Sequence, residues 1–347
     1  MIHYGLPKKG DFQHFSVCGP FEPTLDDLFD PRGFHGIVPE ASYLYGTVRD
    51  ESGDMYSMVR RLPSNTPSAV TEKGAERKAP GRRLMVQSNR GDKDVRLLVD
   101  LIKSAGVSDD LRVERAADLI RLVSADDPRG RAWQIDFKSG ALAWQEDEVL
   151  ALQGDMIPLG LQWYLIDRED SIMYCSRSYE VQGTVLGKKV SGFIFLDQCY
   201  MPEGGRLYAH RDTLMGQQVE VAWFSWGTRW NDGSVEVGHF LVGNDRAGFG
   251  MATDGKKLTL LTSNVTGTVK RAADGYWHDG IQIDANGEAW EIISDPRGRQ
   301  IDMMKLANPQ QEGLVQRVGE KRKPVAWFSW GESAPKHGNR GHNRYAI

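Results

Sequence analysis

Short runs of alternating apolar and polar residues, separated by turn residues, recur along most of this chain. Residues 41–49 alternate in this way, a Glu-Ser-Gly-Asp turn follows at 51–54, and residues 55–62 continue the pattern. Two-residue alternation on both sides of a glycine-containing turn predicts a β-hairpin. Four more pairs of runs have the same form: 132–137 with 141–146, 179–185 with 189–196, 219–224 with 234–242, and 281–283 with 289–293.

Evenly spaced strands joined by hairpins favour antiparallel sandwiches or up-and-down barrels over parallel α/β units. Helical periodicity is scarce: residues 95–105 and 115–123 show it, but each segment also fits a buried strand. The predicted fold class is therefore all-β. Because 347 residues are many for one domain, we expect two, and we place them at 1–205 and 206–347.

The peptide Val-Ala-Trp-Phe-Ser-Trp-Gly occurs twice, at residues 221–227 and 325–331. Seven identical residues are very improbable by chance, but a single repeated peptide falls far short of a solenoid. We favour two strands that are the first and last of one closed barrel and lie side by side. The alternative is a repeat between two domains.

Composition narrows the class of partner. The chain is 40% apolar and 26% charged with a net charge of −4, which gives no electrostatic reason to expect nucleic acid. It has no apolar run of about 18 residues, so we expect no membrane span. Residues 1–15 lack the apolar core of a signal peptide, and we expect a cytoplasmic protein. The sequence leaves open whether the protein forms a homodimer.

Cofactor and metal motifs are missing from the sequence. Cys18, Cys175 and Cys199 have neither metal-ligand nor disulfide spacing, and the histidines and carboxylates form no metal-ligand pattern. The chain also has no P-loop, no dinucleotide-binding glycine motif and no nucleophile elbow. We therefore expect no cofactor and no metal.

Asp197 is the first candidate for chemistry. It follows the apolar residues 193–196 and precedes Tyr200 closely. Apolar surroundings raise the pKa of a carboxyl group by desolvation and keep a proton available for a general acid. Protonation of an alkene or carbonyl in a dry pocket needs such an acid, with aromatic faces to stabilise the developing cation. The alternative is a structural carboxylate that caps a turn after the strand.

Other candidates for the site follow Asp197 in the sequence. Tyr200 could relay its proton, and His239 lies on the predicted strand 235–242, although both also fit ordinary structural roles. The densest aromatic patch is at 223–230, where strand alternation sends Trp223 and Phe224 to opposite faces. Unless this strand is buried on both sides, the aromatic side chains on one of its two faces line a ligand cavity.

The motifs between Tyr174 and Val242 follow one another in a recognisable order. They are Tyr174, Ser176 and Arg177; Val181, Gly183 and Val185; Asp197-Gln198-Cys199-Tyr200; Trp223-Phe224; and Asn231-Asp232-Gly233. In order and spacing, these roughly 70 residues resemble the AttH-like and hydroxyneurosporene synthase (carotenoid hydratase) group of double-calycin proteins.

This resemblance implies two lipocalin-like antiparallel β-barrel or sandwich domains packed together, and cofactor-free chemistry on hydrophobic molecules. It also implies that Asp197, at the position of the family's motif aspartate, protonates an alkene. The family's next motif residues are histidine, tryptophan and glycine, where this chain has Gln198, Tyr200 and Met201. Because the partners of the acid differ, we expect a different substrate.

Taken together, we expect a cofactor-independent lyase (hydro-lyase or carbon–carbon lyase), hydratase or isomerase. Its substrate would be a hydrophobic aromatic or isoprenoid small molecule bound near the domain interface. Asp197 would be the acid or base, assisted by Tyr200 and His239. The expected substrate contacts are Tyr174, Arg177, Trp223 and Trp226. Two alternatives remain: a non-catalytic lipocalin-like carrier, and a cyclase of polyketide or terpenoid products.

Overall fold

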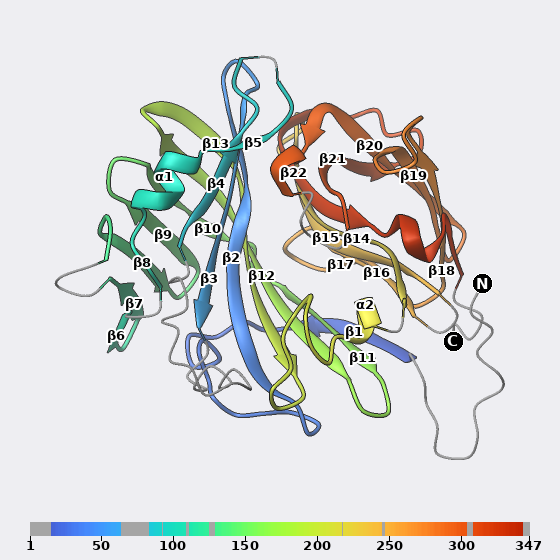
Figure 1. Ribbon diagram of the computed structural model, residues 1–347, viewed down its shortest axis with the longest axis horizontal. Helices are drawn as coiled ribbons and strands as arrows, with labels where there is room; N and C mark the ends of the chain where they lie inside the picture. The colour runs from blue at the N-terminus through green and yellow to red at the C-terminus, as the bar shows by residue number, and fades with distance from the viewer. Residues whose placement is uncertain are drawn as a thin grey trace.

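The computed structural model describes residues 15–63, 83–91, 93–108, 111–124, 129–216, 218–244, 247–303 and 308–342. Within these ranges the regular structure is almost all β-strand, arranged in two antiparallel sheets that each curl into a half-barrel (Figure 1). The predicted all-β class with two lipocalin-like sheets is therefore confirmed. Residues 1–14, where we looked for a signal peptide, lie outside the described residues.

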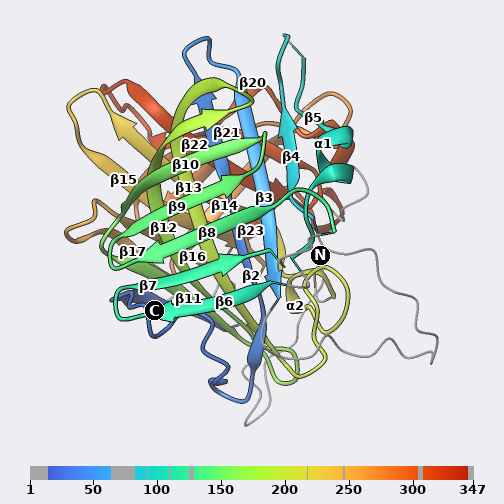
Figure 2. The same cartoon turned by 90° about the vertical axis from the view of Figure 1, so that its left-hand side faces the viewer.

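The first sheet contains the described strands up to Met201. They are β1 (Phe15–Phe21), β2 (Val38–Asp50), β3 (Met55–Pro63), β4 (Met85–Ser88), β5 (Arg96–Leu97), β6 (Arg112–Ala116), β7 (Leu119–Val123), β8 (Trp133–Lys138), β9 (Ala141–Glu146), β10 (Leu150–Met156), β11 (Gly160–Ile166), β12 (Ile172–Val185) and β13 (Lys188–Met201). Their order is β5-β4-β3-β2-β13-β12-β10-β9-β8-β7-β6, and β11 pairs with both β12 and β1. In Figure 2 the part of this sheet that contains β6–β10 faces the viewer.

The second sheet begins at Glu220. Its strands are β14 (Glu220–Trp230), β15 (Val235–Gly243), β16 (Gly248–Thr253), β17 (Leu258–Thr262), β18 (Val265–Arg271), β19 (His278–Ala285), β20 (Glu288–Arg299), β21 (Gln310–Arg317), β22 (Pro324–Ser333) and β23 (Arg340–His342). Their order is β17-β16-β15-β14-β22-β21-β20-β19-β18-β23. The chain passes from one sheet to the other between Met201 and Glu220, the stretch that contains our predicted domain boundary.

Helical segments are short in the described chain. They are α1 (Val99–Ser104), α2 (Thr213–Gly216), and the 3-10 turns η1 (Ile301–Met303) and η2 (Pro335–His337). Of the two ambiguous segments in the sequence, 95–105 contains α1, whereas 115–123 lies mainly in the strand β7. None of the helices described is long and apolar enough to cross a membrane.

All five predicted hairpins are confirmed. The pairs are β2 with β3, β8 with β9, β12 with β13, β14 with β15, and β19 with β20. The turn between β19 and β20 shows why the sequence signal was readable: Asn286 and Gly287 both have positive φ angles, of 57° and 87°. A two-residue hairpin turn of this kind requires positive φ at both central positions, and Asn-Gly accommodates it best.

Strand alternation builds a separate core for each sheet. On β2, Leu44 and Val48 point into the first core, while Tyr45 and Thr47 point toward the second sheet. The second core contains Trp226, Phe240 and Trp290, and its tryptophan rings are 5.6 Å apart. Burying a large apolar side chain contributes roughly 1.5–3 kcal/mol, so each half-barrel has its own stabilising interior.

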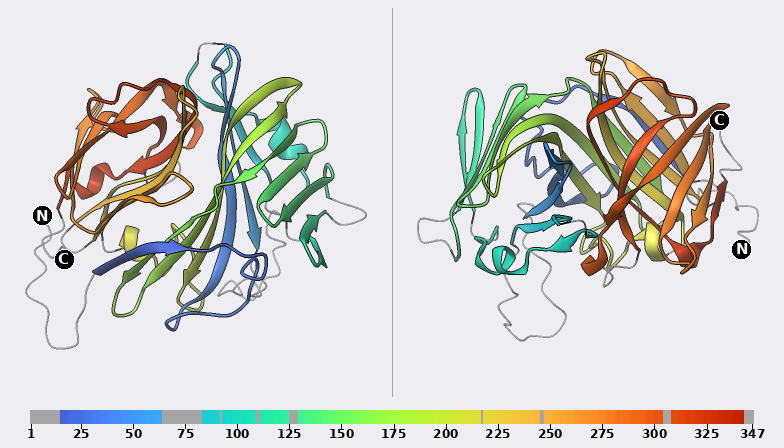
Figure 3. Two further views of the ribbon diagram at one scale, coloured as in Figure 1. Left: turned by 180° about the vertical axis from the view of Figure 1, so that it is seen from behind. Right: turned by 90° about the horizontal axis from the view of Figure 1, so that it is seen from above.

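The two sheets pack against each other through their remaining faces. Strands β2 and β13 of the first sheet contact β22 of the second, and Figure 3 shows the two half-barrels side by side. The apolar part of this interface is the cluster of Phe193, Phe195, Phe328 and Trp330. Strand β13 is consequently buried on both faces, which explains why residues 193–197 read as a nearly continuous apolar run.

The two copies of the heptapeptide lie on neighbouring strands. Residues 221–227 are in β14 and residues 325–331 in β22, and these strands pair antiparallel, with Ser225 opposite Trp330 and Trp226 opposite Ser329. The prediction that the two copies lie side by side is confirmed, but the two strands are not the first and last of a closed barrel, because β23 follows β22 in the chain and both β14 and β22 lie inside the path of the sheet. The sheet that they join is the second half-barrel, whose path runs from β17 to β23.

Candidate active site

Asp197 lies on β13 between the two sheets. Because side chains alternate along a strand, Phe193, Phe195 and Asp197 share the face toward the second sheet, and Ile194 and Leu196 point into the first core. Asp197 is opposite Ser176 on β12 and Tyr43 on β2, and it is only 3% exposed. The position that looked like a strand end in the sequence is therefore a buried site at the interface.

Two neutral hydroxyl groups hold the Asp197 carboxyl. Ser176 Oγ lies 2.5 Å from Oδ1, and the Tyr45 hydroxyl lies 2.8 Å from Oδ2. Burial raises the pKa of Asp197 to about 7, and the two hydrogen bonds lower it by less than burial raises it. A carboxyl with this pKa is present in both protonation states near neutral pH, which suits it to give and take a proton.

The Tyr45 hydroxyl connects Asp197 to the second sheet. It lies 2.6 Å from Ser225 Oγ on β14, and Ser225 Oγ lies 3.0 Å from His239 Nδ1 on β15. A tyrosine has only one hydroxyl proton, so it donates to either Asp197 or Ser225. When Asp197 is protonated, the chain can run from Asp197 through Tyr45 and Ser225 to His239; when it is ionised, Tyr45 donates back to it.

His239 ends this chain as a neutral acceptor. Burial lowers the pKa of His239 to about 3, so its ring is uncharged at physiological pH. Its ring stacks on Trp223 with centroids 5.3 Å apart and meets the edge of Phe195 at 5.6 Å. With Nδ1 facing Ser225, the proton of the neutral ring belongs on Nε2, a buried atom without a hydrogen-bond partner among the described residues.

An aromatic cluster borders the chain of polar groups. Tyr174 stacks on Trp163 at 4.9 Å, and both rings approach Trp223, at 6.1 Å and 5.3 Å. Phe249 packs against Trp163 and Trp223. Of the residues predicted from the sequence, the structure thus brings Asp197, His239, Tyr174 and Trp223 to one face of the interface.

Tyr200 and Arg177 lie on the other side of the first sheet from Asp197. Tyr200 packs with Ile37 and Met173, and a cavity of about 10 Å³, enough for roughly one water molecule, lies beside it. Arg177 is adjacent to Ser176, so alternation turns it away; its Nη1 donates to the Thr24 carbonyl at 2.6 Å.

Trp226 lies in the core of the second half-barrel. It stacks near Phe240 at 6.4 Å and is fully buried. Trp223 and Trp226 are three residues apart on one strand, so they point to opposite faces, and only Trp223 reaches the interface.

Sequence reasoning missed Tyr45, Ser176 and Ser225 as members of the site. Tyr45 is 152 residues from Asp197 and 180 residues from Ser225. Hydroxyl side chains are common in strands, so no local pattern marks these three. A weak signal was present for Ser176, which lies two residues after Tyr174 and hence on the same strand face.

The described residues contain no group of three or more His, Cys, Asp or Glu side chains arranged to hold a metal ion. What the site does contain is a titratable carboxyl, a chain of hydroxyls and aromatic faces. Such a set can transfer protons to and from an apolar molecule and stabilise positive charge on it.

Several solved structures are similar to this chain over most of its length. No family model matches the chain, and no curated protein matches it. A protein provisionally named AttH from Nitrosomonas europaea is similar with a TM-score of 0.45 and 11% identity, over 89% of this chain and 97% of that one.

Two further solved structures are similar. CghA with Sch210972 gives a TM-score of 0.43 and 11% identity over 94% of this chain and all of that one. Kievitone hydratase from Nectria haematococca gives a TM-score of 0.38 and 10% identity, over 85% of this chain and 89% of that one.

Proposed function

We propose that this protein is a cofactor-independent acid–base enzyme, a lyase, hydratase or isomerase, that acts on a hydrophobic aromatic or isoprenoid small molecule between its two sheets. One observation carries the proposal: Asp197 is buried at the interface, its hydrogen bonds within the described chain come from neutral hydroxyls, and burial raises its pKa to about 7. This arrangement keeps a proton available, and it lies beside the hydroxyl chain that leads to His239 and the aromatic ring of Trp223.

In the proposed reaction, the Asp197 carboxyl gives its proton to one carbon of a substrate double bond. The π electrons form the new C–H bond, and positive charge develops on the neighbouring carbon. In a hydration, water adds to that carbon and a proton of this water passes to the Asp197 carboxylate. In an isomerisation, a different carbon of the cation gives its proton to the Asp197 carboxylate, and the C–H electrons form the new double bond. The reverse of the hydration is a lyase reaction.

The hydroxyl chain assists this cycle. When Asp197 becomes a carboxylate, Tyr45 and Ser176 both donate to it, so the negative charge is stabilised as it forms. Since Tyr45 also contacts Ser225, which contacts neutral His239, protons can be redistributed along the chain without charge entering the interface.

The aromatic cluster supports the proposed substrate class. The faces of Trp163, Tyr174 and Trp223 are stacked or tilted near one another beside His239, and they suit contact with an apolar or aromatic skeleton. Electron-rich rings also stabilise a developing carbocation. The motif resemblance in residues 174–242 points to the same class of substrate.

The test begins with a ligand screen and proceeds to Asp197→Asn. Aromatic and isoprenoid compounds that raise the thermal midpoint are incubated with the protein, and products are identified by mass spectrometry. Asp197→Asn keeps the shape and removes the acid, so turnover falls by about 10²–10⁴-fold while ligand binding persists.

Glu332→Gln is the matched control. Glu332 on β22 is also buried, accepts hydrogen bonds from Tyr208 and Gln310, and has its pKa raised by burial. We expect this variant to retain turnover. If bound compounds are never converted and Asp197→Asn changes neither binding nor any product, the protein is a carrier and the enzymatic proposal is wrong.

A further inference from the structure

A second buried carboxyl lies at the interface, beyond the Asp197 site. Glu312 on β21 is fully buried, and its Oε1 accepts hydrogen bonds from Ser57 at 2.8 Å and from Thr47. Thr47 follows Tyr45 by two residues on β2, so the two side chains share a face about 7 Å apart. Glu312 therefore contacts the first sheet immediately beside the hydroxyl chain.

Arg49 is the next residue on the same face of β2. It is 8% exposed, and its guanidinium lies 4.3 Å from the centre of the Trp327 ring. Its Nη1 is 3.3 Å from Asp295 Oδ2, so one edge of the guanidinium is paired. Its other edge, Nε and Nη2, has no hydrogen-bond partner among the described residues.

The free atoms of this cluster are complementary to one chemical group. The Nε and Nη2 edge of a guanidinium presents two parallel N–H donors, the geometry that matches a carboxylate. Glu312 Oε2 is likewise buried without a partner in the described chain. Because burial raises the pKa of Glu312 to about 7, its protonated form can supply a third donor. A buried donor without a partner destabilises the folded protein, and a ligand that accepts a hydrogen bond from it would remove that cost.

We propose that Arg49 and Glu312 form a carboxylate-binding site that holds the acidic end of the substrate. The inference rests on the proposed function and deepens it, because it makes the substrate a hydrophobic carboxylic acid. Asp295 already balances the charge on Arg49, so the ligand carboxylate is accommodated by the two N–H donors together with the neutral form of Glu312.

The position of the site also sets a length for the substrate. Arg49 follows Tyr45 by four residues on an extended strand, a distance of about 13 Å. An acid bound at Arg49 would reach the Asp197 site with a carbon skeleton of roughly that length. Short acids such as acetate would bind at Arg49 and Glu312 without reaching Asp197.

The experiment compares 2-naphthoate with 2-naphthamide by isothermal titration calorimetry. The two probes share an aromatic skeleton and differ in the carboxylate. We expect the wild-type protein to bind naphthoate at least about tenfold more tightly than the amide, and Arg49→Lys to remove that preference, because a lysine cannot form the two-donor edge. Lysine keeps the charge opposite Asp295, which favours folding, and a thermal melt checks it.

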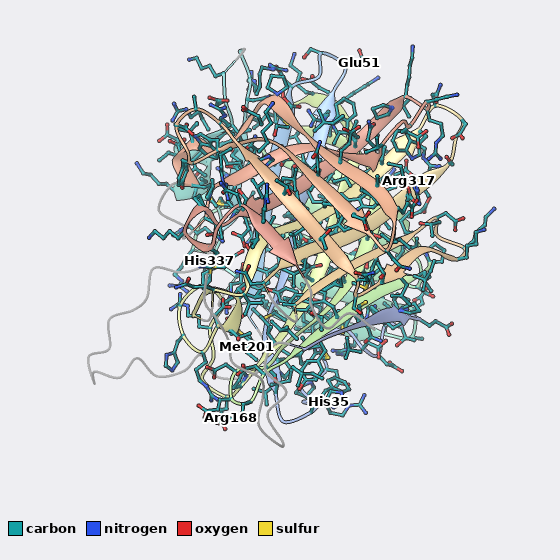
Figure 4. All side chains as sticks on the ribbon, turned by 90° about the vertical axis from the view of Figure 1, so that its right-hand side faces the viewer. His35, Glu51, Arg168, Met201, Arg317 and His337 are labelled. Atoms are coloured by element: carbon teal, nitrogen blue, oxygen red, sulfur yellow. The ribbon has the colours of Figure 1, made fainter. Side chains whose placement is uncertain are left out.

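Arg317→Lys is the matched control. Arg317 also lies over a tryptophan, Trp290 at 4.1 Å, but it pairs with Glu236 and Glu288, and Figure 4 labels it on the second sheet. We expect this variant to bind both probes as the wild type does.

Three results would overturn the inference. The wild type could bind 2-naphthoate and 2-naphthamide equally, or folded Arg49→Lys could keep the wild-type preference for 2-naphthoate. The third result is that 2-naphthoate does not bind at millimolar concentration, which would mean that water and not a ligand occupies the site. The first and third do not depend on any variant folding. Asp197→Asn separates the two proposals, because it should keep the naphthoate preference. Loss of the preference in Arg49→Lys with no turnover by the wild type would retain the site and reject the enzyme.

Discussion

Two copies of one heptapeptide have opposite environments in this protein. In residues 221–227, Phe224 and Trp226 fill the core of the second half-barrel, and Ser225 faces the interface, where it contacts Tyr45 and His239. In residues 325–331 the same pattern is inverted: Phe328 and Trp330 face the interface, and Ser329 is buried on the opposite side, its hydroxyl without a partner among the described residues.

The inversion follows from antiparallel pairing. Residues directly opposite each other share a face of the sheet, and Ser225 is opposite Trp330 while Trp226 is opposite Ser329. Each of these two opposed pairs therefore places one serine and one tryptophan on the same face of the sheet. Identical sequences acquire different roles because register, and not residue type, decides which side of the sheet a side chain occupies.

The largest expected effect is a difference in stability and ligand binding between the substitutions of Trp226 and Trp330. Trp226→Ala removes a fully buried ring from the second core and should lower the free energy of unfolding by about 3–5 kcal/mol, measured by chemical denaturation. Trp330 is slightly exposed and lies 5.8 Å from the Tyr45 ring, so Trp330→Ala should also loosen Tyr45 and weaken ligand binding. Equal loss of ligand affinity in both folded variants would contradict the assignment of the two faces.

The two serines provide a matched pair. Ser225→Ala breaks the link between Tyr45 and His239 and should cost about 1–3 kcal/mol of stability as well as turnover. Ser329→Ala removes a buried hydroxyl that has no hydrogen-bond partner in the part of the chain that the structure describes, so the stability of this variant should stay within about 0.5 kcal/mol of the wild type or rise. Thermal and denaturant unfolding of both variants checks this; similar losses would refute it.

The interface should also respond to pH. The pKa of Asp197 rises from its ordinary value of 3.8 to about 7 in the folded protein because of burial. The stability associated with its neutral form is full below about pH 4 and is lost as pH rises through 7, by up to about 1.4 kcal/mol per pH unit. Asp197→Asn should reduce this slope in denaturation curves between pH 5 and 8; Ser329→Ala should leave it unchanged.

The smallest expected effect concerns Tyr45. Its hydrogen bond lowers the pKa of Asp197, so Tyr45→Phe should move that pKa upward while the ring keeps its contacts with Phe195 and Phe328. A pH–rate profile, or a titration of the carboxyl followed by NMR, should show the shift. A downward shift would mean that Tyr45 does not donate to Asp197.

Much of the fold was predictable because its signals are local. The hairpins were readable from alternation and turn residues, and the resemblance in residues 174–242 supplied the two lipocalin-like sheets. Asp197, Tyr174, Trp223 and His239 were also identified as candidates, since acid and aromatic residues in apolar strands are conspicuous. Whether they catalyse or bind a substrate stays a prediction for the experiments above.

The rest of the candidate site was beyond the sequence. Tyr45 and Ser225 are ordinary strand residues separated by 180 positions, and only the packing of one sheet on the other brings them within 2.6 Å. Arg49 and Glu312 come together in the same way, from β2 and β21. Tyr200 and Trp226 were chosen for closeness in sequence to Asp197 and Trp223, and Arg177 for its place in the motif that begins at Tyr174. Alternation places all three on other faces.

The sequence by itself determined the strands, their turns and the two apolar faces of β13, because these depend on the two-residue period of an extended chain and on backbone angles at a few turn residues. Tertiary structure alone decided which polar groups share the interface. Proximity across two sheets depends on register and packing, so the partners that set the proton chemistry of Asp197 appear only when the half-barrels meet.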